Sequence, residues 1–168
     1  QIEKAMMAAG ADSVPFNSVL SGPNAALPHG NTSSRVIQEG ELVICDIGAG
    51  FKGYFGDITR TIAAGKPSDE MIAAYNAVYD ANKAGREAVR PGMKAEELDA
   101  ICRQVIEKAG LGSLFIHRTG HGLGLEIHEH PRISRVESKL AAGNVVTVEP
   151  GLYYPGTGAV RIEDVVVV

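Results

Sequence analysis

The segment His117–Pro131 reads HRTGHGLGLEIHEHP and holds four of the five histidines of the chain, separated by glycines. Histidine titrates near neutral pH and, as a neutral base, ligates metal ions. A single histidine on an apolar face is usually a core residue, but four in one glycine-broken segment are poorly explained in that way. The segment therefore predicts a metal or catalytic site, with chance clustering on a surface loop as the alternative.

The composition of the 168-residue chain is that of one globular domain, which we place at residues 1–168. The net charge is −4 and no basic run appears, so we expect no nucleic-acid partner. The two cysteines, Cys45 and Cys102, lack CxxC spacing, which favours a reducing compartment. No apolar run is long enough for a membrane span and no signal peptide is apparent, so we expect a soluble cytoplasmic protein without a membrane partner.

Apolar periodicity and chain-breaking residues predict an α+β fold. Helices are expected over 1–10, 68–89 and 94–109. Strands are expected over 41–47, 54–62, 144–149 and 159–168, with strand remnants and loop over 13–31. This order favours helices on the outer face of a curved, mostly antiparallel sheet. Because the chain begins inside a helix and stops inside a strand, we expect a piece of a longer protein, truncated at both ends.

The first predicted hairpin brings two aspartates together. If its turn is Phe51-Lys52, Asp46 lies directly opposite Asp57. Like charges directly across a sheet destabilise it, and both aspartates have apolar neighbours in the chain. Two such carboxylates persist only when they are protonated, hydrogen-bonded or bound to a cation. The alternative is a register that differs by one residue, which would move one aspartate to the solvent face.

The last predicted hairpin repeats this arrangement with two glutamates. A turn centred on Gly156 brings Glu149 level with Glu163, which lies in the apolar run VRIEDVVVV. Pro150 disturbs the ladder, so this register is less secure. Taken alone, each glutamate is more often a solvated strand residue. Coincidence is a weaker explanation when two hairpins show the same acidic pairing.

Four carboxylates and one imidazole form a hard, oxygen-dominated ligand set. Such a set suits Mn²⁺, Fe²⁺, Co²⁺ or Zn²⁺ and does not suit a thiolate-bound metal. Four negative charges neutralise two dications, and two metals about 3.5–4 Å apart can bridge and activate a hydroxide at neutral pH. The residues therefore predict a two-metal hydrolase.

Three other motifs are rejected on their context. The GxGxxG match Gly48–Gly53 is followed by a predicted strand, whereas a dinucleotide-binding fold requires a helix there. The run His128–Pro131 is not HExxH, and Pro131 would break the helix which that motif needs. No serine or cysteine has the sequence context of a nucleophile elbow.

Four motifs in this order carry a resemblance to a known family: DIGAGFKGYFGDITRT, GHGLGLEIHEHP, VVTVEPGLY and VRIED. They resemble the metal-dependent Xaa-Pro peptidases, prolidase and aminopeptidase P, of the pita-bread family that also includes methionine aminopeptidases. The resemblance covers nearly the whole chain and implies part of a catalytic domain with the pita-bread (creatinase/aminopeptidase) fold. In it, Asp57 and Glu163 would contact both metals, and His121 would hold one. The five implied metal ligands are Asp46, Asp57, His121, Glu149 and Glu163.

The resemblance also implies roles around the metals. His29 and His128 resemble the histidines around the scissile carbonyl, and His117 resembles one that lines the pocket beside the proline. Arg161 resembles the arginine that packs against the metal-site carboxylates. Glu149 would double as the acid/base. The implied catalytic residues are thus His29, His117, His128, Glu149 and Arg161.

The implied function is hydrolysis of the peptide bond before proline by a metal-bridging hydroxide, as an Xaa-Pro dipeptidase or aminopeptidase. The expected cofactors are two divalent metal ions, Mn above all, with Co, Zn or Fe as alternatives. The expected partners are peptides with proline at the second position and, in the full-length protein, a second copy of the chain. A non-catalytic binding module of the same fold and a methionine-type aminopeptidase are the alternatives. The complete ligand set disfavours the first, and the forms VEPGLY and VRIED disfavour the second.

Overall fold

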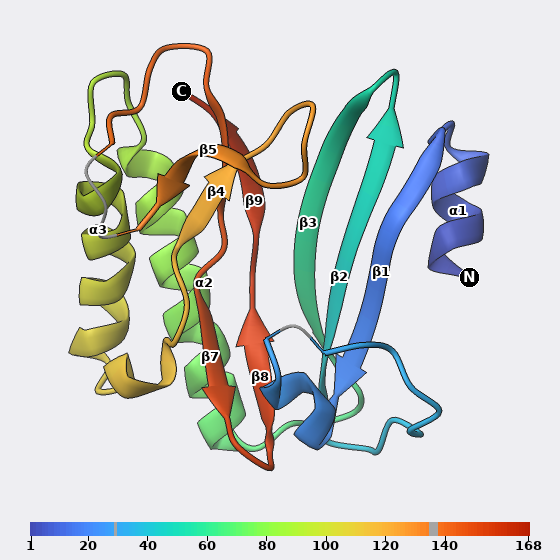
Figure 1. Ribbon diagram of the computed structural model, residues 1–168. Helices are drawn as coiled ribbons and strands as arrows, with labels where there is room; N and C mark the ends of the chain where they lie inside the picture. The colour runs from blue at the N-terminus through green and yellow to red at the C-terminus, as the bar shows by residue number, and fades with distance from the viewer. Residues whose placement is uncertain (29, 135–137) are drawn as a thin grey trace.

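The structure, a computed structural model, describes residues 1–28, 30–134 and 138–168 (Figure 1). The chain has two halves, divided between Ala63 and Asp69, and each contains helices and antiparallel strands. The first half contains α1 (Ile2–Ala8), β1 (Ser13–Ser21), the 3₁₀ helix η1 (Gly22–Ala26), β2 (Leu42–Phe51) and β3 (Tyr54–Ala63). The second contains α2 (Asp69–Ala88), α3 (Ala95–Lys108), the 3₁₀ helix η2 (Gly112–Leu114), β4 (Gly120–Gly122), β5 (Glu129–Ile133), β6 (Val145–Val148), β7 (Gly151–Tyr154), β8 (Gly158–Arg161) and β9 (Asp164–Val167).

The strands form three antiparallel sheets, in the orders β1-β2-β3, β5-β4-β6-β9 and β7-β8. An isolated bridge between Thr59 of β3 and Glu163 joins the first sheet to the second half of the chain. Helices α2 and α3 cover the outer side of the second half, and α1 lies beside β1 at the opposite edge of the molecule (Figure 1). The expected arrangement, antiparallel strands with helices outside them, is confirmed.

The two long helices lie where the sequence predicts them, within a residue at each end. The Ser68 side chain caps α2 by accepting a hydrogen bond from the Met71 amide at 3.3 Å. Helix α3 buries Leu98, Cys102 and Ile106 against α2 and the strands. With residues of the neighbouring strands, these faces form the main apolar core, most of whose members lie in the second half of the chain. Within the described residues no helix combines the length and the apolar character needed to cross a membrane.

The predicted register of the first hairpin is wrong by two residues. Asp46 pairs with Thr59, and Asp57 pairs with Gly48, so the two aspartates are not directly opposite each other. The turn is Lys52-Gly53, with φ of 50° and 84°, because a tight hairpin turn needs positive φ at both central positions. A shift of two residues preserves the face, because side chains alternate with a period of two. Asp46 and Asp57 therefore still point to the same side of the sheet.

The second hairpin has the predicted register, but each of its two sides is divided into two short strands. Gly151 pairs with Arg161 across β7 and β8, and Val148 pairs with Asp164 across β6 and β9. Glu149 and Glu163 lie between these two ladders, at the same level on the two chains. The segment 151–154, expected to be loop, is strand β7, and the strand expected over 159–168 is interrupted between β8 and β9. Pro150 explains the interruption, since it has no amide hydrogen for a ladder bond.

Candidate metal centre

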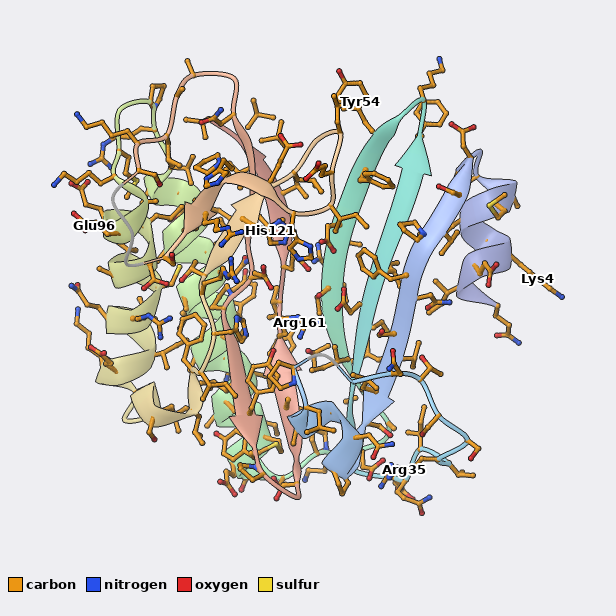
Figure 2. All side chains as sticks on the ribbon, in the orientation of Figure 1. Lys4, Arg35, Tyr54, Glu96, His121 and Arg161 are labelled. Atoms are coloured by element: carbon orange, nitrogen blue, oxygen red, sulfur yellow. The ribbon has the colours of Figure 1, made fainter. Side chains whose placement is uncertain are left out.

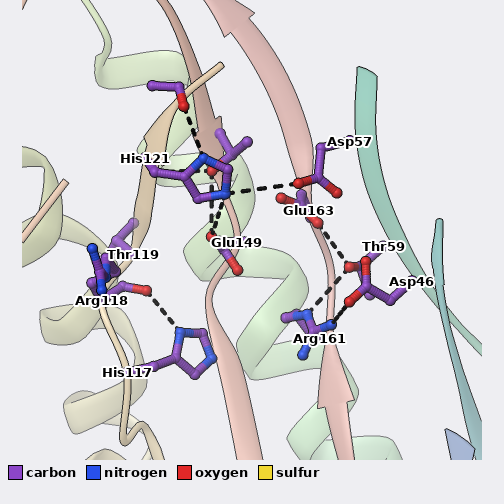
Figure 3. Close-up of polar contacts among 12 residues, drawn as sticks. Asp46, Asp57, Thr59, His117, Arg118, Thr119, His121, Glu149, Arg161 and Glu163 are labelled. Carbon is purple, nitrogen blue, oxygen red and sulfur yellow. Dashed lines mark hydrogen bonds and ion pairs between the residues drawn. The ribbon is translucent and has the colours of Figure 1, made fainter. Parts of the chain in front are cut away.

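Acidic and imidazole groups from both halves of the chain converge in the centre of the molecule. Asp57, His121 and Glu163 are buried, and each offers a ligand atom within 4.8 Å of those of the other two. The His121 Nε2 atom lies 3.7 Å from Asp57 Oδ2 and 3.4 Å from Glu149 Oε1 (Figure 3). Asp46 lines the same cavity, whose volume is about 420 Å³. The structure thus brings together all five residues that were predicted as ligands.

Two carboxylate oxygens in this cluster are buried without a hydrogen-bond partner among the described residues. Asp57 Oδ1 and Glu163 Oε1 accept no hydrogen bond from any described residue. Burying an unpaired carboxylate oxygen is costly, because it gives up its hydrogen bonds to water. The His121 Nδ1 atom lies 2.9 Å from the Gly122 carbonyl oxygen, which can only accept, so Nδ1 carries the proton and Nε2 offers its lone pair to the cluster. The two unpaired carboxylate oxygens and the Nε2 lone pair are ligand atoms that fit a divalent cation.

Burial shifts the titration of these groups in opposite directions. It raises the pKa of Asp57 to about 7, with the negative charge of Asp46 adding to the rise. It raises the pKa of Glu149 to about 8 and that of Glu163 well above its usual range. It lowers the pKa of His121 to about 4. Each shift favours the neutral form, so without cations this cluster holds protons that metal ions would have to displace.

The metal-free protein should lose stability as pH rises from about 6.5 to 8. Asp57 and Glu149 bind protons in the folded state that the unfolded chain has already released, so the free energy of unfolding falls through their folded pKa values. The slope is up to about 1.4 kcal/mol per pH unit for each proton. His121 acts oppositely, but only below its ordinary value of 6.5. Urea unfolding of the chelated protein measures this slope, and a stability that rises with pH in this window would contradict the assignment.

Arg161 and Thr59 connect the carboxylates of the two hairpins. The Arg161 guanidinium is buried and donates hydrogen bonds to Asp46, to the Tyr153 hydroxyl at 2.8 Å and to Thr59 Oγ1 at 3.2 Å. The Thr59 hydroxyl in turn donates to Glu163 Oε2 at 2.8 Å. Arg161 thus contacts Asp46 directly and Glu163 through Thr59, whereas its role at a metal site stays a prediction. Thr59 and Tyr153 were not singled out from the sequence; their place in the motifs DITRT and EPGLY was the available signal.

Thr147 links the histidine to the acid/base candidate. Its hydroxyl accepts a hydrogen bond from the His121 amide at 3.0 Å and lies 3.4 Å from Glu149 Oε1, to which it donates. Thr147 is fully buried in β6, where its neighbours Val146 and Val148 are apolar. The signal for this contact in the sequence is a lone polar residue in an otherwise apolar strand.

Of the other three histidines predicted at the site, two line the cavity. His128 lines the cavity, and its ring centre lies 4.2 Å from that of His121. His117 lines the cavity too, with Nδ1 2.7 Å from the Arg118 carbonyl oxygen and its ring edge-on to Tyr153. His29 lies outside the described residues. Figure 2 shows His121 and Arg161 between the sheets, whereas side chains such as Lys4 lie at the periphery.

Close packing of β4 on β6 should make the position of His121 sensitive to its neighbour Gly120. A Cβ atom on Gly120 would lie 2.0 Å from the Thr147 carbonyl oxygen, so Gly120→Ala must push the strands apart. We expect a loss of about 1–3 kcal/mol in stability together with weaker metal binding, measured by thermal unfolding and metal titration. Gly56→Ala is the matched control, because its Cβ would meet nothing closer than 3.8 Å. Equal behaviour of the two variants would contradict this reading.

A curved antiparallel α+β fold around a buried carboxylate and imidazole cluster defines a protein with a candidate divalent-metal centre. The sequence assigns it further: the chain belongs to metallopeptidase family M24, which matches residues 1–168.

Solved and curated relatives agree with this assignment. The Xaa-Pro dipeptidase of Pyrococcus furiosus is 47% identical over 170 residues, which cover 100% of this chain and 49% of that protein. The solved prolidase from Pyrococcus furiosus has a TM-score of 0.96 at 47% identity, over 99% of this chain and 50% of that one. A variant of Escherichia coli aminopeptidase P in complex with substrate has a TM-score of 0.86 at 27% identity, over 99% and 45%. The pita-bread fold expected from the motifs is confirmed, and the chain spans about half the length of these relatives.

Proposed function

We propose that this chain carries the metal centre of a dinuclear metallopeptidase that cleaves the peptide bond before proline. The observation that carries the proposal is the buried convergence of Asp57, His121 and Glu163, with two carboxylate oxygens that no described residue satisfies. The names of the similar proteins, Xaa-Pro dipeptidase and prolidase, support this substrate class. Membership of a metallopeptidase family supports hydrolysis over binding alone.

The proposed metal ligands are the five groups that converge. When bound, divalent ions supply Lewis acidity toward a substrate carbonyl and lower the pKa of a water molecule. Mn²⁺ is the proposed native ion, with Co²⁺, Zn²⁺ and Fe²⁺ as alternatives, since carboxylate oxygens and one imidazole accommodate all of them. The ligands are Asp46, Asp57, His121, Glu149 and Glu163.

Glu149 is the proposed acid/base. Its carboxyl group lines the cavity 3.4 Å from His121 Nε2, so it lies beside a proposed ligand and would be within reach of a substrate in the cavity. Nearby positive charge favours its carboxylate form. In that form Glu149 accepts the proton of the attacking water and then delivers it to the proline nitrogen as that nitrogen leaves.

The surrounding histidines and Arg161 complete the proposed site. His128 lines the cavity beside His121 and would donate to the oxygen that gains negative charge, as would His29. His117, packed edge-on against Tyr153, would form one wall of the pocket for the proline ring. Arg161 holds Asp46 in place through its guanidinium.

Two further proposals concern the compartment and the self-association of the full-length protein. We place it in the cytoplasm, where the free thiols Cys45 and Cys102 would stay reduced. We also propose that the full-length protein associates with a second copy of itself, which sedimentation or light scattering would measure.

Metal analysis and a cleavage assay test the function together. The full-length protein should contain two equivalents of divalent metal and release proline from Ala-Pro but not alanine from Ala-Ala. Treatment with EDTA should abolish cleavage, and Mn²⁺ should restore it. Comparing Ala-Pro with Gly-Pro-Xaa substrates separates a dipeptidase from an aminopeptidase. Metal-loaded protein that binds these peptides without cleaving them would instead identify a binding module.

A further inference from the structure

Helix α2 carries a buried amide in the middle of its apolar face. Asn82 is 1% exposed, and the neighbours that α2 buries include Val78, Ala81 and Gly85. Asparagine is a poor residue for a helix interior, because its side chain competes for backbone hydrogen bonds. A buried amide is also costly unless it is hydrogen-bonded. The position of Asn82 therefore calls for specific hydrogen-bond partners.

Those partners are two backbone carbonyls at the interruption of the second hairpin. Asn82 Nδ2 donates to the Val148 oxygen at 2.9 Å and to the Ile162 oxygen at 3.3 Å. Val148 immediately precedes Glu149, and Ile162 immediately precedes Glu163. At this level the chain passes from the β6-β9 ladder to the β7-β8 ladder. One amide group thus ties together the two backbones that present these glutamates.

Arg86, one turn along α2, orients the amide. Its Nε donates to Asn82 Oδ1 at 2.8 Å and lies 3.3 Å from the carboxylate of Asp164, the residue after Glu163. Carbonyl oxygens only accept and a guanidinium only donates, so the Asn82 oxygen must face Arg86 and its nitrogen must face the strands. The network therefore admits one orientation of the amide.

Gly85 allows α2 to approach the strand closely enough for these bonds. A Cβ atom on Gly85 would lie 2.8 Å from Val148 Cγ1 and 2.6 Å from Cys102 Sγ. A larger residue would force the Cys102 or Val148 side chain, or α2 itself, to shift. Gly85 follows Asn82 by three residues, so both lie on the same side of the helix. The helix is thus docked at the level of the two glutamates.

We infer that Asn82 is a positioning residue that sets the separation of Glu149 and Glu163 through the carbonyls of Val148 and Ile162. The inference rests on the proposed function, in which both glutamates hold cations. Metal sites tolerate little ligand displacement, and loss of a group that orients a ligand typically weakens metal affinity by about 10–100-fold. Asn82 acts without touching metal or substrate.

The test compares Asn82→Leu with Val78→Ala in the full-length protein. Leucine has a similar volume but no donor, so the two carbonyls lose their tie. Val78 is fully buried on the same helix and contacts the core, so Val78→Ala reports general destabilisation. We expect Mn²⁺ affinity in a calorimetric titration to fall at least tenfold in Asn82→Leu and to stay within threefold of wild type in Val78→Ala. Equal affinities in the two variants would overturn the inference.

A second variant and a second measurement cover the case in which Asn82→Leu does not fold. Arg86→Met removes the group that orients the amide from a partly exposed position, so the fold should persist. We expect a smaller loss of Mn²⁺ affinity and faster amide exchange over 148–151 and 161–164 in the chelated protein. Unchanged exchange there would overturn the inference. Failure of the wild-type protein to bind Mn²⁺ would refute the proposed function separately, because exchange is measured without metal.

Discussion

Glu149→Gln should leave a folded, metal-binding protein whose turnover has fallen by roughly 10²–10⁴-fold, the range that a positioned acid/base contributes. Glutamine cannot accept or return a proton, although it keeps the shape of the side chain and the oxygen that accepts from Thr147. Because the pKa of Glu149 is raised to about 8 by burial, the metal-free wild type already holds a largely neutral side chain at this position near pH 7. The substitution should therefore cost little stability.

The measurement is kcat on Ala-Pro together with thermal unfolding and metal content. Glu87→Gln, an exposed residue on α2, supplies the matched control and should behave as wild type. Near-normal turnover in Glu149→Gln would remove Glu149 from the mechanism. A protein that has lost its metal as well would show that this residue acts chiefly as a ligand.

Asp57→Asn should release metal and abolish activity while making the metal-free protein no less stable at pH 8. A carboxylate oxygen of Asp57 lies within 4.8 Å of ligand atoms of His121 and Glu163. One Asp57 oxygen has no hydrogen-bond partner among the described residues. Asparagine removes the charge that attracts cations. It also removes a buried carboxyl whose pKa is raised to about 7, and whose ionisation therefore opposes folding at pH 8. The substitution should therefore weaken metal binding without destabilising the metal-free protein, so a general loss of stability cannot account for the loss of metal.

Thermal unfolding with and without Mn²⁺ separates these effects. In the wild type, saturating Mn²⁺ should raise the Tm, because a ligand that binds only the folded state stabilises it. That increase should disappear in Asp57→Asn and persist in Asp80→Asn, an exposed aspartate on α2. If Asp57→Asn kept the full increase, Asp57 would not be a ligand.

The first hairpin shows how much of the site depends on local pattern. Because side chains alternate between the two faces of a strand, Asp46 and Asp57 were predicted on one face. That prediction is correct, although the predicted turn and the direct pairing were both wrong. It survives because the error was an even number of residues. The observed turn places Gly53 at one of its two positive-φ positions, whereas a Phe51-Lys52 turn would need two non-glycine residues there, so Gly53 was the local signal for the correct turn.

The second half shows where local pattern is insufficient. Strand β7 lies between Pro150 and Pro155, in the segment that was expected only to join two strands, and the short β4 consists entirely of glycine and histidine. Strand β4 forms because β5 and β6 pair with it, and β7 forms because β8 pairs with it and because Leu152 packs into the main core. Tertiary context here overrides propensity.

The sequence by itself determined the helices, the acidic and imidazole groups and the family motifs, because these depend on side-chain chemistry and on spacing within one segment. Only the tertiary structure decided that Thr59 bonds Glu163, which of the acids Arg161 bonds, and that Asn82 bonds the Val148 and Ile162 carbonyls, across separations of 104, 115 and up to 80 residues. Such contacts depend on how complete elements pack, and no local pattern encodes that packing. The proposed metal ligands can thus be named from the chain, whereas contacts such as those of Thr59 and Asn82 emerge only from the fold.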